Sequence, residues 1–526
     1  WQYRDWVINA INLDMPFDQF VVEQLAGDML PNPTMAQRIA TGFHRNTQIN
    51  TEGGVDKEQF RVDSIFDRIA TTGEVMFGLT FGCVQCHDHK FDPFTHVEYY
   101  QMFAFFNQAD EPRIEAPTAE ESRKRANHTE KVKVLDTRVK ALEEKDPERK
   151  KLAAELAKLK KARPRATTAL VMSQRKSHRV TRRFIQGNFT RPAETVKPGV
   201  PEILHAFPET ESTNRLDFAR WATSSNNPLI ARVTINRMWS HYFGKGIVET
   251  ENDFGTQGAP PSHPKLLDWL ATEFVRSKWS RKAMHRLIVT SATYRQSSNQ
   301  RADLAKADPY NKLLGRQSRL RLDAEILRDN ALAASGLLST KMGGPGVFPP
   351  QPPGCMNLGQ HRKKWTTSTG VDRYRRAVYT YRWRATPHPA LKVFDTPDAF
   401  ASCTRRIRSN TPLQALTLLN DPAFFEIAQG LAERIYREDG NTDEERIALG
   451  VRLCLVREPD IREVSVLKSF LNKQRDLYAN MDAQTQSQVA QRTHGHAVRE
   501  SYRSEQAAWI MLARVLLNLD ETITRE

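Results

Sequence analysis

The chain has 526 residues, of which 39% are hydrophobic and 26% are charged, a composition typical of globular protein with room for two to four domains. No run of about 18 apolar residues occurs, so no transmembrane helix is expected in this stretch. Five cysteines are too few for a disulfide scaffold. The chain begins at Trp1 without the features of a signal peptide, and we expect it to be a mature product or an excised piece.

The formal net charge of +15 is concentrated in two segments. Residues 120–165 contain 16 Lys/Arg and 9 Asp/Glu, and residues 361–408 contain 12 Lys/Arg and 3 Asp. Such patches can attract an anionic partner, such as an acidic polysaccharide or an acidic electron-transfer protein. Nothing in the chain resembles a nucleic-acid-binding module, which argues against nucleic acid as the partner.

The first 118 residues carry helical apolar spacing interrupted by turn signals. Two short amphipathic helices are expected before residue 31, and residues 56–79 predict a long helix. Asp92 and Pro93 are expected to cap a further helix. By spacing alone its aromatic side chains favour a packed core, although they could also wall a porphyrin. These side chains are Tyr99, Tyr100, Phe103, Phe105 and Phe106.

The most informative motif is the pentapeptide at residues 83–87. Cys83, Cys86 and His87 have the C-x-x-C-H spacing used for covalent attachment of a c-type haem. The two thiols would form thioethers with the vinyl groups of the porphyrin, and His87 would ligate the iron from one face. The motif therefore predicts a redox protein that matures outside the cytosol, in the periplasm or at the cell surface.

The same cysteines permit other interpretations. Cys83, Cys86 and His89 are also spaced as zinc ligands, with His96 as a fourth. A C-x-x-C pair can also form a redox dithiol or a structural disulfide. If the pair carries haem, three cysteines remain, and at least one is then a free thiol. These three are Cys355, Cys403 and Cys454.

The second axial ligand of such a haem is not evident from the sequence. His89 follows His87 too closely to reach the opposite face of the same iron without a sharp chain reversal. The other candidates carry the nitrogen or sulfur atoms that haem iron accepts. They are His44, Met76, His96 and Met102. We leave this position unassigned, and it is open in the simplest interpretation.

The remaining chain reads as a hairpin, a β segment and a long helical region. Heptad-like spacing on both sides of Asp146-Pro147 predicts an antiparallel helical hairpin. We expect a mainly α, multi-helical, two-domain protein with this inserted hairpin and a small β segment. The predicted parts are residues 1–118 with the C-x-x-C-H motif, the hairpin at 119–165, the β segment completing the first domain at 166–205, and a helical C-terminal domain at 206–526.

Several longer motifs resemble the planctomycete cytochrome-c-like family. In the first part of the chain they are residues 52–54, Glu58, Arg61, 67–68, 71–73, 77–93, 99–100 and 105–106. Its usual companion domain is resembled at residues 227–229, 232–233, 236–239, 375–379, 394–395, 410–416, 419–422 and 516–521. The resemblance implies an exported protein with two main domains of unknown function. It also implies a frequent N-terminal cytochrome c domain as a redox partner, and we expect this domain to be missing from the stretch that begins at Trp1.

Two classes of function follow. In the first, a covalent haem passes single electrons to or from a partner protein. In the second, a metal or carboxylate cluster hydrolyses a complex polysaccharide. The candidate groups for the second are Glu52, Glu58, Asp67, Asp88, His89 and Asp92. The favoured interpretation of these carboxylates is structural, with Glu58 and Asp67 in ion pairs with Arg61 and Arg68.

The arginine-rich segment adds a third hypothesis. Its guanidinium groups could bind sulfate or uronate groups through bidentate contacts, or haem propionates, or they could form structural ion pairs. They are Arg373, Arg375, Arg376, Arg382, Arg384, Arg405, Arg406 and Arg408.

Overall fold

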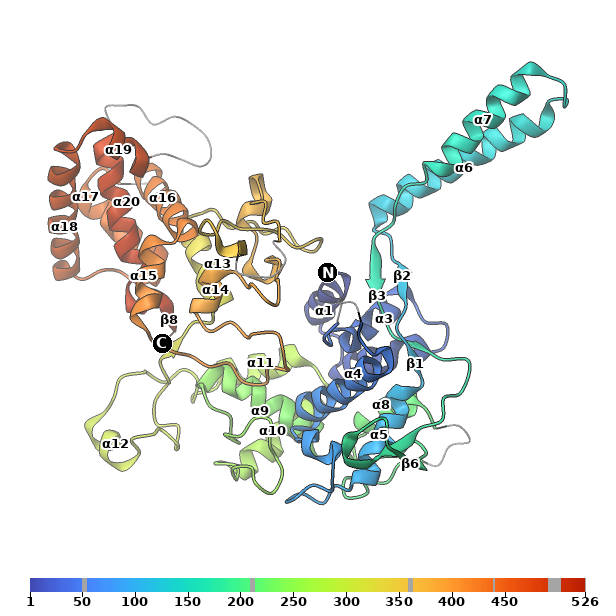
Figure 1. Cartoon of the computed structure of the whole chain (residues 1–526). Coiled ribbons are helices and arrows are strands. Elements are labelled where there is room, and N and C mark those ends of the chain that lie inside the picture. The colour runs from blue at the N-terminus through green and yellow to red at the C-terminus, as the bar shows by residue number, and fades with distance from the viewer. Residues whose placement is uncertain (50–53, 209–212, 358–362, 439, 491–502, 526) are drawn as a thin grey trace. The chain divides into compact units, whose positions relative to one another are not determined.

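The computed structural model describes residues 1–49, 54–208, 213–357, 363–438, 440–490 and 503–525 (Figure 1). In these residues the chain forms twenty α-helices and four two-stranded antiparallel sheets, which confirms the predicted mainly α fold class. Within the same residues, none of the helices combines the length and apolar character needed to cross a membrane.

The chain divides into two compact units. The first unit comprises Trp1–Val233, Gly255–Gln257 and Asp268–Met284. The second unit comprises Thr234–Phe254, Gly258–Leu267 and His285–Glu526. Three helices have residues in both units, namely α9 (Ile230–Phe243), α10 (Pro264–Arg276) and α11 (Arg281–Thr290).

The other helices of the first unit follow the apolar periodicity of the sequence. They are α1 (Gln2–Asn12), α2 (Phe17–Ala26), α3 (Met35–Ala40), α4 (Lys57–Thr72), α5 (His96–Asn107), α6 (Ala119–Ala141), α7 (Pro147–Lys161) and α8 (Arg215–Ala222). Three of them, α3, α5 and α6, begin with capping boxes in which a threonine pairs with a glutamine or glutamate three residues later. The two helices expected before residue 31 are α1 and α2.

The helix expected at residues 56–79 ends earlier than its apolar pattern. Asp56 caps it by accepting hydrogen bonds from two backbone amides of the first turn. After Thr72 the chain widens into the π-helical turn Gly73–Phe77, and Gly78 ends that turn in the left-handed region with φ 62°. Glycine adopts this conformation without the strain of a Cβ atom. This turn leads the chain directly into the cysteine motif.

The predicted helical hairpin is formed by α6 and α7 (Figure 1). Asp146 caps α7 and Pro147 occupies its first turn, as the sequence indicates. Leu152 and Leu156 of α7 are buried, whereas α6 has no buried residue. Its charges pair locally on the surface, for example Lys124 with Glu120 at 2.5 Å. The basic character of this segment is thus that of a solvated helical surface.

Short strand pairs form the small β segment of the first unit. β1 (Ala109–Asp110) pairs with β4 (Ser173–Gln174), and β2 (Arg113–Glu115) pairs with β3 (Thr168–Leu170). β5 (Arg182–Phe184) pairs with β6 (Pro192–Thr195). The first two pairs join the chain before the hairpin to the chain after it, so the hairpin is an insertion in the first unit. In the second unit, β7 (Leu320–Arg321) pairs with β8 (Thr524–Arg525).

The second unit is built around a buried C-terminal helix. Its remaining helices are α12 (Ala302–Ala307), α13 (Ala324–Ala334), α14 (Pro389–Val393), α15 (Pro412–Asn420), α16 (Pro422–Arg437), α17 (Asp443–Leu455), α18 (Ile461–Ala479), α19 (Ala483–Ala490) and α20 (Arg503–Leu517). Trp509 and Leu516 of α20 pack with Leu431 of α16, Ile447 of α17 and Leu471 of α18. Burial of each such side chain contributes about 1.5–3 kcal/mol, which makes this bundle a sizeable core.

Candidate functional site

The cysteine motif lies on a short irregular loop of the first unit. The 3-10 turn Gly82–Gln85 carries Cys83, and Cys86 follows it directly. Val84 is fully buried beneath the turn, whereas Cys83, Cys86 and His87 are exposed. Both cysteines are free thiols. The loop therefore presents two sulfur atoms and one imidazole to solvent, and the two cysteines are not joined to each other in this structure.

A tight backbone approach lies next to Cys86. Gly187, in the loop between β5 and β6, has φ 72°, and a Cβ atom there would lie 3.1 Å from Cys86 Sγ. At Gly73, in the preceding turn, a Cβ atom would clash with the Phe81 ring. Phe81 in turn packs against Phe94 with a centroid distance of 5.0 Å. Close packing on both sides of the motif thus restricts the backbone conformation of the loop.

The imidazole of His87 is oriented by the backbone of the next residue. Its Nδ1 lies 2.7 Å from the carbonyl oxygen of Asp88. A carbonyl oxygen only accepts hydrogen bonds, so Nδ1 carries the proton and donates it. Nε2 of the neutral ring then holds the free electron pair, which is the form of histidine that binds a metal ion.

The carboxylate of Asp88 organises the start of the next helix. Its Oδ1 accepts a hydrogen bond from the His96 backbone amide at 2.6 Å. The His96 ring bonds the Gln85 carbonyl through Nε2 at 3.0 Å and lies 3.2 Å from an Arg183 nitrogen through Nδ1. Burial lowers the pKa of His96 and so favours its neutral form. Both groups thus serve to fold the loop onto α5.

His89 and Asp92 form a second buried polar pair. His89 Nδ1 accepts a hydrogen bond from the Asp92 backbone amide at 2.8 Å. The Asp92 carboxylate accepts one from the Thr256 amide at 2.6 Å, and Gly255 lies so close that a Cβ atom would clash with it. The prediction that Asp92 caps the next helix is wrong, because Thr95 caps α5 in a capping box. Asp92 instead anchors a distant loop of the same unit.

The remaining hydrolase candidates are Glu52, Glu58 and Asp67, of which Glu58 and Asp67 lie on α4. Glu58 forms the expected ion pair with Arg61 at 2.6 Å. Arg68 donates to Glu111 and to the His44 carbonyl. Glu52 lies outside the described residues.

The alternative zinc set also remains dispersed. Across the described ranges, no group of three or more His, Cys, Asp or Glu side chains is arranged to hold a metal ion. Both ring nitrogens of His96 already have partners. Zinc binding by Cys83, Cys86, His89 and His96 would therefore require His96 to leave these contacts.

The aromatic side chains of α5 form the core beneath the loop. All five are at most 2% exposed. Phe103 packs against Phe66 and Phe184 with centroid distances of 5.6 and 5.8 Å. The Tyr100 hydroxyl donates to the Gln85 carbonyl at 3.1 Å, which ties this core to the motif. The cluster thus supports the loop from inside, as the core interpretation predicts.

The proposed distal ligands are buried. His44, Met76 and Met102 are 2%, 4% and 1% exposed. Burial and the neighbouring arginines lower the pKa of His44 well below its ordinary value, which keeps the ring neutral. None of these three side chains lies exposed beside the thiols.

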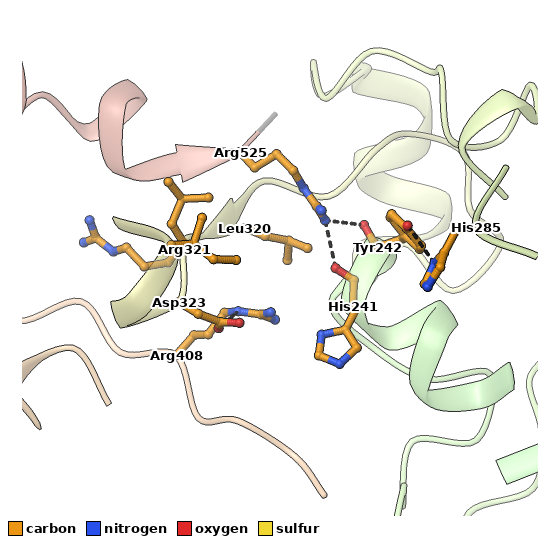
Figure 2. Close-up of a pocket in the computed structure, with 10 residues that line it drawn as sticks. His241, Tyr242, His285, Leu320, Arg321, Asp323, Arg408 and Arg525 are labelled. Carbon is orange, nitrogen blue, oxygen red and sulfur yellow. Dashed lines mark hydrogen bonds and ion pairs between the residues drawn. The ribbon is translucent and has the colours of Figure 1, made fainter. Parts of the chain in front are cut away.

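Sequence reasoning missed two adjoining cavities of the second unit. The smaller has a volume of about 200 Å³ and includes His241, Leu320 and Arg408 in its lining (Figure 2). The larger has a volume of about 550 Å³, shares these three residues and adds Glu251 and the backbone segment 403–408. The arginine-rich segment pointed to part of this lining. No motif marked His241 or Glu251.

The other arginines of this segment that the contacts describe serve the fold. Arg373 makes a bidentate ion pair with Glu426 at 2.6 and 2.7 Å. Arg375 is 1% exposed, lies 3.8 Å from the Tyr379 ring centroid and donates to backbone carbonyls. These contacts support the structural interpretation of the segment for both residues.

Comparison with known proteins gives two matches to family models. Residues 1–111 match PSCyt2, described as a protein of unknown function (DUF1549). Residues 214–471 match PSD1, described as a protein of unknown function (DUF1553). No curated protein and no solved structure matches the chain. The chain thus contains one region similar to each of these two domains of unknown function.

Proposed function

We propose that the loop at residues 83–87 carries a covalently attached c-type haem, and that the protein transfers electrons in the periplasm or at the cell surface. The observation that carries this proposal is the state of the loop itself. Cys83 and Cys86 are unbridged and exposed, and they directly precede an exposed histidine. A disulfide or a buried motif would have left no access for a porphyrin.

The orientation of His87 supports its role as the proximal ligand. Because its Nδ1 donates to the Asp88 carbonyl, its Nε2 offers an electron pair. A hydrogen bond at the other nitrogen also fixes the ring plane and raises the basicity of the ligand. When bound, the haem would supply a one-electron redox couple.

The packing under the loop supports a rigid attachment site. Val84 is fully buried, and the Gln85 carbonyl accepts hydrogen bonds from both Tyr100 and His96. The residues next to the two cysteines in sequence thus help to hold the thiols in place. A preorganised site loses little conformational freedom when the cofactor is attached.

We expect the second axial position to be open to an added ligand. Of the candidates, His44, Met76 and Met102 are buried in the core. His89 Nδ1 and both nitrogens of His96 are engaged in hydrogen bonds. Among the described residues, none of these five side chains is presented to solvent beside His87. Added imidazole should therefore bind the reduced or oxidised haem and shift its absorption bands.

The test is expression of the chain in a bacterial periplasm together with the haem-attachment machinery. The expected result is a haem absorption band that stays with the protein after acid-acetone extraction. Cys83→Ser and Cys86→Ser should each lower covalent attachment severely, and the double variant should abolish it. Cys403→Ser is the matched control, because Cys403 is also exposed.

Absence of covalent haem from the wild-type protein would overturn the proposal. Metal analysis of the same sample addresses the zinc alternative. One zinc per chain that is lost in the double cysteine variant would support zinc instead. Equal haem content in the cysteine variants and the wild type would place any haem elsewhere.

A further inference from the structure

The larger cavity of the second unit has the size and lining of a small-molecule site. Its volume of about 550 Å³ falls in the usual range for such sites. Its lining comes from the end of α9, from the chain that follows α9, from β7 and from residues 403–408. All of these belong to the second unit. The cavity is therefore independent of the cysteine loop.

Three arginines of one short segment line this cavity. Arg406 is held by a bidentate ion pair with Glu325 at 2.5 and 3.2 Å. Arg408 lies beside Asp323, with Nε 3.4 Å from a carboxylate oxygen, and this buried Nε has no hydrogen-bond partner. Arg405 is exposed, and in the described residues no carboxylate lies within ion-pair distance of it. Arg405 and Arg408 thus each have guanidinium N–H groups that can donate hydrogen bonds to a ligand.

The lining also includes Glu251, Ser240 and His241, which can contact a polar group of a ligand. Glu251 is only 6% exposed, and burial raises its pKa, while hydrogen bonding to Ser240 and the cations Arg405, Arg237 and Arg408 oppose the rise. His241 and Arg408 line both cavities, and Asp323 lines the smaller one (Figure 2). Loss of solvent around its ring lowers the pKa of His241.

We propose that this cavity binds a small ligand that carries an oxyanion, with Arg405 and Arg408 contacting the anion and Glu251 with Ser240 contacting a polar group of the ligand. Guanidinium groups match the planar or forked geometry of carboxylate, phosphate and sulfate oxygens. Arg406 and Arg408 have the carboxylates of Glu325 and Asp323 beside them. Arg405 has no carboxylate within ion-pair distance in the described residues, so its charge is available to an oxyanion.

The volume separates this proposal from simple adsorption of an ion. A lone sulfate or phosphate fills only a fraction of 550 Å³, whereas a sugar-sized molecule with one acidic group reaches both the arginines and Glu251. Such ligands share an oxyanion. Experiment is to distinguish whether this group is the carboxylate of a sugar or a phosphate or sulfate group.

The experiment is isothermal titration of the full chain with galacturonate, inorganic phosphate, inorganic sulfate and galactose at low ionic strength. We expect saturable binding of at least one of the three anions and none of galactose. Stronger binding of galacturonate than of the inorganic ions would identify a carboxylated sugar as the carrier. The opposite order would identify a phosphate or sulfate group.

The decisive variants are at Arg405, because its side chain is exposed, and circular dichroism checks that they fold. Arg405→Gln should weaken binding about tenfold, and Arg405→Lys about threefold, because lysine keeps the charge but lacks the forked donors. The matched control is Arg462→Gln, at an exposed arginine of α18 outside the cavity, which changes the net charge equally.

Two results would overturn the proposal. The first is the lack of saturable binding of any of the three anions at millimolar concentration. The second is equal affinity of the Arg405→Gln, Arg462→Gln and wild-type proteins, which would show that binding follows net charge and not the cavity.

Discussion

Particular cysteine and histidine side chains of the two units lie in opposite surroundings. In the first unit, Cys83, Cys86 and His87 project from an exposed loop over an aromatic core. In the second unit, Cys454 is 6% exposed within the helical core and His388 is 3% exposed. The difference shows that residue type alone does not mark a reactive site. Access of solvent to the sulfur and nitrogen atoms decides which of these groups can bind a cofactor.

The largest expected effect is on thiol reactivity. In haem-free protein produced in the cytosol, Cys83 and Cys86 should react with iodoacetamide at rates typical of exposed thiols. Cys454 should react more slowly by about a thousandfold or more, because its reaction requires opening of the core. Each ~1.4 kcal/mol in the free energy of that opening slows the reaction by a factor of about ten. Burial also raises the pKa of Cys454 to about 12, which removes the thiolate.

Peptide mapping by mass spectrometry at successive times measures these rates. Denatured protein is the control, in which all three thiols should react alike. Equal protection of Cys83, Cys86 and Cys454 in the folded protein would contradict the described exposure of the loop.

The next effect is a dependence of stability on pH. Burial lowers the pKa of His388 to about 4, whereas the unfolded chain binds this proton near the ordinary value of about 6.5. Between these values the unfolded state holds more protons, so the free energy of unfolding falls as the pH decreases from about 6.5 to about 4. The contribution of His388 is about 3 kcal/mol at most. Buried His44 acts in the same direction.

The measurement is urea unfolding between these two pH values for the wild type and His388→Asn. The variant loses the hydrogen bond from Nε2 to the Pro350 carbonyl at 2.8 Å and so is less stable at neutral pH. Its loss of stability on acidification should nevertheless be smaller. An unchanged pH slope would contradict the assignment of a buried neutral imidazole at this position.

The smallest expected effect is the change in the free energy of unfolding when single cysteines are replaced by alanine. Cys454→Ala should lower the free energy of unfolding by about 1 kcal/mol, because it removes a buried sulfur from the core of the second unit. Cys86→Ala should change it by less than about 0.5 kcal/mol, because the side chain is exposed. Urea unfolding of the haem-free proteins measures both. A larger cost at Cys86 than at Cys454 would reverse the comparison.

The features that depend on local spacing were predictable from the sequence. Apolar spacing predicted the two helices before residue 31, α1 and α2, and Asp146 with Pro147 predicted the start of α7. The ion pair of Glu58 with Arg61 also follows from their separation on one helix.

The features that depend on distant contacts were not predictable. Asp92 looks like a helix cap in the sequence, yet its carboxylate binds the amide of Thr256, which is 164 positions away. The cavity lining likewise combines Glu251 with arginines about 150 positions later, and neither belongs to a recognisable motif. Only the thiol spacing of the loop was visible in advance. Its exposure required the structure.

The most direct test of the central claim is mass analysis of the tryptic peptide that spans residues 69–90, taken from protein exported together with the haem-attachment machinery. This peptide contains both Cys83 and Cys86. The account predicts that it carries the mass of one haem, linked through both sulfur atoms. An unmodified or internally disulfide-bonded peptide from such protein would contradict the account.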